Sequence, residues 1–172
     1  MALYGKRLAM SFKTLKLVIA AFIPTAVIGF IFYKMIKNVF FNNNYIILWS
    51  LLLGGIFLII FELLHREKKE ALDEISSMSY PQAFMIGIFQ SIAIIPGVSR
   101  AAATIIGGLI LGLKRKTIVE FSFLLAVPTM GAATALDLIK SAGTFKPGDF
   151  LSLTLGFLVS FIVALLSIKF LL

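Results

Sequence analysis

The chain has 172 residues, of which 60% are hydrophobic and 14% are charged, and its mean hydropathy is +1.03. A soluble domain of this length does not need so much apolar surface, so the composition predicts an all-α, polytopic integral membrane protein. The net charge of +8 would also suit nucleic acid, but basic residues beside apolar spans explain it, and the absence of cysteine excludes disulfides, a thiol nucleophile and a thiolate metal site.

Four apolar runs are long enough to cross a bilayer as helices. They lie at about 17–33, 45–64, 117–139 and 150–172. The first run follows a basic N-terminal stretch and is too long for the apolar region of a signal peptide. The longest hydrophilic stretch, 65–79, carries both charge signs and is predicted to be a solvated cytoplasmic linker. We expect one membrane domain over residues 1–172.

The segment at about 81–113 differs from the four spans. Its two apolar runs, 83–95 and 101–113, are each about a dozen residues long, which is too short to cross about 30 Å of hydrocarbon. A polar turn with the sequence Pro-Gly-Val-Ser-Arg lies between them, at 96–100. Two half-length helices joined by such a turn predict a re-entrant helix hairpin.

The distribution of basic residues tests this hairpin. If residues 81–113 re-enter, eleven basic residues share one side of the membrane and four share the other, whereas a single crossing divides them nine to six, with Arg100 left out of both counts. The larger group is Lys6, Arg7, Lys13, Lys16, Arg66, Lys68, Lys69, Lys114, Arg115, Lys116 and Lys169. The smaller group is Lys34, Lys37, Lys140 and Lys146. The positive-inside rule therefore favours the hairpin, with the N-terminus and the linker in the cytoplasm and the turn toward the outer side.

The turn itself has the chemistry of an anion site. Its Pro-Gly pair ends one helix, and the small residues after Arg100 can begin another. Ser99 stands where an N-cap would, so the N–H groups of the next turn point toward it. A helix start of this kind attracts anions, and the Arg100 guanidinium has the forked geometry that suits phosphate. One interpretation is a phosphate-binding turn inside the membrane; the other is a helix corner whose arginine snorkels to a lipid headgroup.

Several segments together resemble the undecaprenyl-diphosphatase, or bacitracin-resistance, family. The resemblance covers nearly the whole chain and is carried by Gln90–Arg100, Thr104, Phe121–Pro128 and Ala133–Leu138. It implies a bacterial inner-membrane enzyme that hydrolyses undecaprenyl diphosphate to undecaprenyl phosphate and phosphate, recycling the lipid carrier of peptidoglycan synthesis and giving bacitracin resistance. It also implies an inverted-repeat bundle with two re-entrant hairpins and a site open to the outer face.

The chain departs from the family pattern in two ways. Family members are longer: their first half carries a Glu-x-x-x-Glu motif on the other hairpin and then a Ser-Ser-Thr-Gly-His segment, and a further span follows at the end. Here only Glu70 and Glu74 have the matching spacing, which we interpret as coincidence within the linker. The second departure is at Ala101 and Ala102, where the family has Ser-Gly, so a hydroxyl that could bond phosphate is missing at Ala101.

These departures shape the expected cofactor and partners. The family implies a divalent cation, Mg²⁺ or Ca²⁺, held by acidic residues of the first hairpin, so its ligands are not expected in this chain. We expect an incomplete form with little activity alone, whose partners are membrane lipid, a polyprenyl diphosphate substrate and either a complementing N-terminal half or a second copy. No nucleic acid partner is expected.

The resemblance also implies roles for the residues of the turn. Hydrolysis of a phosphoanhydride needs positive charge near its oxygens and a nucleophile in line. Arg100 is the candidate clamp for the diphosphate, and Ser99 is a phosphate ligand, the nucleophile or simply an N-cap. Thr104 hydrogen-bonds either the substrate or its own helix, Gly97 permits close backbone approach, and Gln90 faces the site from the first half-helix.

Other polar residues have simpler explanations. Glu62 and Glu120 pair with nearby basic clusters, Asp137 caps or packs a helix end, and His65 is solvated. The sequence has no P-loop, zinc or dinucleotide motif. The alternative function is a membrane transporter or lipid translocator, because inverted repeats and broken helices also build transporters. Arg100 beside Ser99 at a helix start favours phosphate chemistry.

Overall fold

The computed structural model describes residues 12–35, 44–65, 71–141 and 149–171. The chain divides into two compact units, Met1–Gly131 and Ala132–Leu172. The described residues are helical except for short connections, and their β-structure is limited to an isolated bridge between Leu72 and Leu113.

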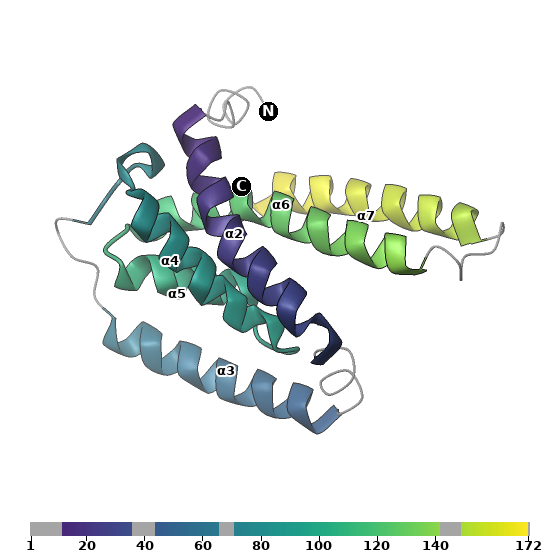
Figure 1. Ribbon diagram of the computed structural model, residues 1–172, viewed down its shortest axis with the longest axis horizontal. Coiled ribbons are helices and arrows are strands. Elements are labelled where there is room, and N and C mark those ends of the chain that lie inside the picture. The colour runs from purple at the N-terminus through teal and green to yellow at the C-terminus, as the bar shows by residue number, and fades with distance from the viewer. Residues whose placement is uncertain (1–11, 36–43, 66–70, 142–148, 172) are drawn as a thin grey trace. The chain divides into compact units, whose positions relative to one another are not determined.

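Four helices are long and apolar enough to cross a membrane, which shows the predicted class of polytopic helical membrane protein. They are α2 (Phe12–Met35), α3 (Asn44–Leu64), α6 (Arg115–Ser141) and α7 (Asp149–Leu171) (Figure 1). Each contains the described part of one predicted span. Helix α7 belongs to the second unit.

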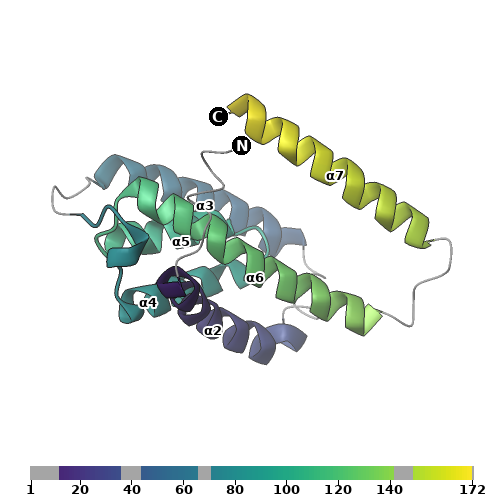
Figure 2. The ribbon, with the colours of Figure 1, turned by 90° about the horizontal axis from the view of Figure 1, so that it is seen from above.

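The predicted hairpin is two short helices, α4 (Tyr80–Ser91) and α5 (Arg100–Ile110). Ser79 begins α4 through a reciprocal capping box with Gln82, and the short 3₁₀ helix η3 (Ile92–Ile94) carries the chain from α4 into the turn. Helix α4 packs against α2 on one side and α5 on the other (Figures 1 and 2).

Backbone hydrogen bonds close the hairpin at its open end. Leu72, in the entering segment, donates its N–H to the Gly112 carbonyl at 2.9 Å and accepts the N–H of Lys114 at 2.9 Å. Gly112 has a positive φ of 84°, a conformation that favours glycine and ends α5. The chain therefore enters and leaves the hairpin at the same end, which is the geometry of a re-entrant segment.

Close backbone contacts set the positions of α4 and α5. A Cβ atom on Gly87 of α4 would overlap the Ala21 carbonyl of α2, and one on Gly107 of α5 would lie 2.7 Å from Phe89. Small residues at helix contacts let backbones approach closely, which is how helices associate in lipid. The buried core of this unit consists of Leu17, Val18, Ala21, Met78, Ala83, Ile86, Leu109, Leu113, Ile118, Phe121 and Leu125.

The prediction of a solvated linker is wrong for its second part. Met78 is buried, and Leu72 and Ile75 pack against the core. Asp73 accepts a hydrogen bond from Lys114 at 2.9 Å, and its carbonyl accepts one from Thr117 at 2.8 Å. Apolar side chains hidden among charged ones therefore attach residues 71–79 to the hairpin, while residues 66–70 lie outside the described part.

Candidate functional site

Ser99 begins α5 as an N-cap. Its backbone is extended, with φ −70° and ψ 118°, and its Oγ accepts a hydrogen bond from the Ala102 N–H at 3.3 Å. The N-cap interpretation of Ser99 is thus confirmed, and it is compatible with a contact to phosphate, because the side chain is exposed and its hydroxyl proton can still be donated.

The close backbone approach predicted at Gly97 is to α3. Its φ of 93° is one that side-chain-bearing residues rarely adopt, and a Cβ there would lie 2.8 Å from the Ile47 carbonyl oxygen and 3.1 Å from the Ser50 Cβ. The space expected for a substrate at this Cα is therefore occupied by the first turns of α3, and Gly97 has a packing role that holds the turn against that helix.

Arg100 lacks a counter-charge within the described residues. The side chain is half-buried, and its Nη1 is buried without a hydrogen-bond partner in that part of the chain. Arginine does not lose its proton in proteins, so a buried guanidinium nitrogen is costly unless an acceptor or anion meets it. A snorkelling arginine would instead place its terminal nitrogens in water.

Thr104 bonds its own helix, which was one of its two predicted roles. The side chain is 0% exposed, and its Oγ1 lies 3.1 Å from the Arg100 carbonyl oxygen and 2.9 Å from that of Ala101. A further contact of 2.7 Å joins it to the Ser122 Oγ on α6. Ser122 was not among the predicted site residues, because nothing in the local pattern shows a contact between residues 18 apart.

Gln90 is held at the contact between α2 and α4. It is 1% exposed, and its Nε2 donates to the Thr25 Oγ1 at 3.2 Å, while Thr25 donates to the Gly87 carbonyl at 2.9 Å. The Gln90 Oε1 is buried and has no partner among the described residues. Its amide nitrogen therefore serves helix packing, and its place near the phosphate stays a prediction.

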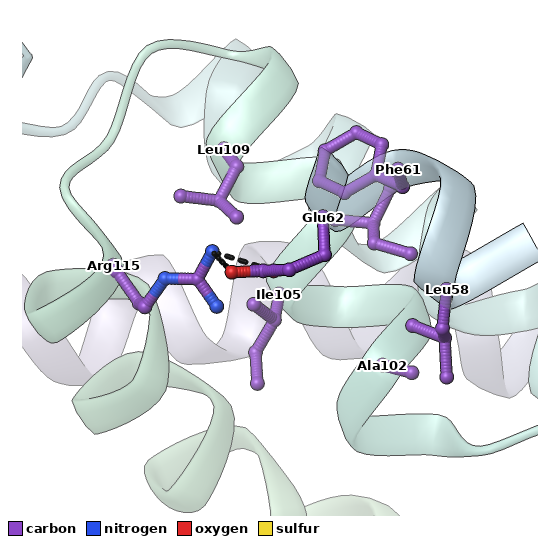
Figure 3. A pocket seen from close by; sticks show the side chains of 8 residues that line it. Leu58, Phe61, Glu62, Ala102, Ile105, Leu109 and Arg115 are labelled. Carbon is purple, nitrogen blue, oxygen red and sulfur yellow. Dashed lines mark hydrogen bonds and ion pairs between the residues drawn. The ribbon is translucent and has the colours of Figure 1, made fainter. Parts of the chain in front are cut away.

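The predicted ion pair of Glu62 is confirmed. The Arg115 Nη2 lies 2.9 Å and 3.0 Å from the two oxygens of the Glu62 carboxylate, between the last turn of α3 and the first of α6 (Figure 3). The pair borders an otherwise apolar pocket of about 240 Å³ between α3 and α5. The pocket is lined by Leu58, Phe61, Glu62, Ala102, Ile105, Ile106, Leu109 and Arg115.

The prediction that His65 is solvated is wrong. Its ring stacks on that of Phe61, with 4.8 Å between the ring centroids, and its Nε2 is buried without a partner in the described part of the chain. The residue directly follows α3, so helical spacing brings its ring onto the side chain four positions earlier. It therefore packs at the end of α3.

The described residues do not fit a divalent cation. They contain no group of three or more histidine, aspartate or glutamate side chains that could hold a metal ion. Glu74 is exposed and its carboxylate accepts a hydrogen bond from Ser76 at 2.8 Å, while Glu70 lies outside the described residues. A cation at the turn would need ligands from elsewhere.

Comparison with known proteins gives the family. The family model described as bacitracin resistance protein BacA matches residues 4–172. The chain is 52% identical to an undecaprenyl-diphosphatase of Aquifex aeolicus over 97% of its own length and 65% of the relative's. It is 50% identical to one of Sulfurihydrogenibium over 92% and 62% of the two lengths, and 43% identical to one of Wolinella succinogenes over 98% and 65%. It thus spans about two thirds of these relatives, and it belongs to the bacitracin resistance protein BacA family.

Proposed function

We propose that this chain supplies the phosphate-binding part of an undecaprenyl-diphosphatase site. The reaction adds water across the phosphoanhydride of undecaprenyl diphosphate, which breaks a P–O bond and yields undecaprenyl phosphate and inorganic phosphate. The relatives' names support the substrate. The observation that carries the proposal is the buried, unpartnered Nη1 of Arg100 at the capped start of α5.

Phosphate binding is shared by Arg100, Ser99 and the N-terminus of α5. Arg100 pairs with oxygens of the diphosphate, whose charge compensates its buried nitrogen. The Ser99 hydroxyl donates to a second phosphate oxygen while its lone pair still accepts the Ala102 N–H. The positive end of the α5 dipole adds to the attraction of the anion. A ligand role for Ser99 is favoured over nucleophilic attack, because no described side chain bonds its hydroxyl as a base.

The proposed location is the bacterial inner membrane, with the N-terminus and residues 65–79 in the cytoplasm and the turn toward the outer face. Two observations support this orientation. Basic residues concentrate on the predicted cytoplasmic side. Along α3, Gly97 contacts Ile47 whereas Arg115 contacts Glu62, so the turn and the basic cluster lie about 22 Å apart at 1.5 Å per helical residue.

The remaining parts of the site are proposed to come from another polypeptide segment. The chain covers 65% of the Aquifex aeolicus relative, and the described residues hold no acidic cluster. A complementing segment or a second copy of the chain would supply the ligands for Mg²⁺ or Ca²⁺. A polyprenyl diphosphate in the surrounding lipid is the proposed substrate.

Binding of a prenyl diphosphate tests the proposal directly. Calorimetry on the chain in detergent should show farnesyl diphosphate binding more tightly than farnesol, because the turn recognises phosphate. The Arg100→Gln variant should lose this preference while its helical circular dichroism stays unchanged. Equal binding of both lipids by the parent chain would contradict the phosphate site and would favour the transporter alternative.

A further inference from the structure

A buried pair of hydroxyls joins the hairpin to the next span. The Thr104 Oγ1 on α5 and the Ser122 Oγ on α6 are 2.7 Å apart, and the two residues are 0% and 4% exposed. Buried hydroxyls without partners are costly, so such a contact is strongly maintained once the helices are packed. The contact therefore connects the N-terminal half of α5 with α6, a helix that lies further along the chain.

The neighbouring carbonyls fix the direction of the hydrogen bonds. The Thr104 Oγ1 lies within hydrogen-bond distance of the Arg100 and Ala101 carbonyl oxygens, which can only accept. Thr104 therefore donates its single proton to this first turn of α5 and accepts the proton of Ser122. The bonds run in one direction, from Ser122 through Thr104 to the backbone of Arg100 and Ala101.

This chain of bonds ends on the residues that carry the turn. The backbone of Arg100 sets where its guanidinium begins, and the same turn of α5 receives the Ser99 cap. In the middle of α5 the contacts are apolar, because Gly107 packs on Phe89 and Gly108 packs on Ile118 of α6. At the other end of the helix, the Gln82 Nε2 donates a hydrogen bond to the Leu111 carbonyl at 3.1 Å, so the Thr104–Ser122 contact is the one near the turn. Apolar contacts fix the distance between helices but restrain rotation of a helix about its axis only weakly, whereas a directional hydrogen bond restrains it.

We propose that Ser122 is a positioning residue for the phosphate-binding turn: through Thr104 it fixes the rotation of the first turn of α5 and so the aim of Arg100. The inference rests on the proposed function, because it assigns Ser122 to the same site. Ser122 is buried, so it acts without touching the substrate.

Thr129 on the same helix offers a matched control. Its Oγ1 bonds the carbonyls of its own helix, Leu125 at 2.8 Å and Ala126 at 3.1 Å, in the way that Thr104 bonds α5. The Ser122 hydroxyl, in contrast, is directed across to a neighbouring helix. Thr129 is half-buried, so removing each hydroxyl separates the effect of the interhelical bond from that of losing a hydroxyl that bonds only its own helix.

The experiment measures farnesyl diphosphate affinity by calorimetry on the full chain in detergent. Ser122→Ala and Thr104→Val should each weaken binding about tenfold, the size expected from one buried neutral hydrogen bond. The double variant should bind no more weakly than Thr104→Val alone, because both changes break the same chain of bonds. Thr129→Val should bind like the parent, and Ser122→Thr, which keeps the hydroxyl, should restore affinity.

Hydrogen exchange gives a second measurement that needs no substrate. The amides of residues 102–105 should exchange faster in Ser122→Ala than in the parent, and at the parent rate in Thr129→Val. If the parent chain bound no prenyl diphosphate, the proposed function would be wrong. The exchange rates alone would then decide whether Ser122 positions the first turn of α5. Unchanged affinity together with unchanged exchange in Ser122→Ala would overturn the inference, and so would additive losses in the double variant.

Discussion

Arg100 is the residue whose surroundings most clearly require something from outside the described chain. Arginines inside membranes are rare and pair with other groups or lie at functional sites. The buried Nη1 of Arg100 has no partner in the described residues, while the turn that carries it is capped by Ser99 and held against α3 by Gly97. A fixed backbone with an uncompensated cation at its end is the arrangement that the proposed phosphate site needs.

Replacing Arg100 by lysine tests whether geometry matters beyond charge. Lysine keeps the positive charge but cannot make two parallel hydrogen bonds to a phosphate. We expect Arg100→Lys to weaken farnesyl diphosphate binding about 10- to 100-fold, the range for losing charged hydrogen bonds, without unfolding the chain. Calorimetry gives the affinity and circular dichroism the fold. Unchanged affinity would return Arg100 to a snorkelling role.

Asp73 gives the docked linker a pH dependence. The hydrogen bond and the charge of Lys114 hold the pKa of Asp73 below its ordinary value of 3.8. A lowered folded-state pKa stabilises the docked linker above the ordinary value, and this contribution is lost as the pH falls through the lowered pKa. Proteolysis of residues 71–79 should therefore accelerate in acid. Asp73→Asn should show faster proteolysis already at neutral pH, and Glu74→Gln should behave like the parent.

The helices and the hairpin could be predicted from the sequence, but the contacts between them could not. Helix lengths and the Pro-Gly turn depend on interactions between residues that are close in the sequence, so they can be predicted from it. The contact of Thr25 with Gln90 joins residues 65 apart, and that of Thr104 with Ser122 joins residues 18 apart. The docking of Met78 was missed for a related reason. Leu72, Ile75 and Met78 are three apolar residues separated by pairs of polar ones, and so short a pattern is outweighed by the charges of the linker.

The α2–α4 contact depends on the absence of a side chain at Gly87. Any Cβ there would overlap the Ala21 carbonyl and the Pro24 ring, so α4 would have to move away from α2. Gly87→Ala should destabilise the chain by about 1–3 kcal/mol, the usual range for overpacking. Gly131→Ala is the control, because a Cβ at that position meets nothing within 4 Å in the described structure. Unfolding in a denaturing detergent measures both, and equal stabilities would contradict the close contact.

The geometry of the hairpin bears on how many times the chain is expected to cross the membrane. The segments that enter and leave the hairpin meet at Leu72, so we expect α4 and α5 together to add no crossing. In the proposed orientation, we therefore expect the linker and the start of α7 to lie on opposite sides of the membrane. The same arrangement was predicted from the distribution of basic residues in the sequence, by the positive-inside rule.

Cysteine labelling tests this count of crossings, and the chain contains no cysteine that would interfere. Ser77 lies in the docked linker before the hairpin, and Ser141 ends α6. A membrane-impermeant maleimide added to inside-out vesicles should label Ser77→Cys, and the same reagent added to right-side-out vesicles should label Ser141→Cys. Labelling of both from one side would contradict the re-entrant topology.

The activity of the chain alone follows from the charges that the site holds. A diphosphate carries more negative charge than Arg100 can offset, and hydrolysis needs further cations and an activated nucleophile. The described residues contain no acidic cluster that could hold a metal ion, and Glu62 is already paired with Arg115 at the far end of α3. We therefore expect the purified chain to bind farnesyl diphosphate but to release almost no phosphate.

Activity should appear when the chain is reconstituted with the part of the Aquifex aeolicus relative that it does not cover, which is the remainder beyond 65% of that protein. Phosphate release should then depend on Mg²⁺ or Ca²⁺, stop with a chelator and fall sharply in Arg100→Lys, because the ion would offset negative charge on the diphosphate that Arg100 binds. The relative's segment alone, assayed in parallel, should be inactive. Rapid metal-dependent release by the chain without any added segment would show instead that its own residues supply the catalytic acids.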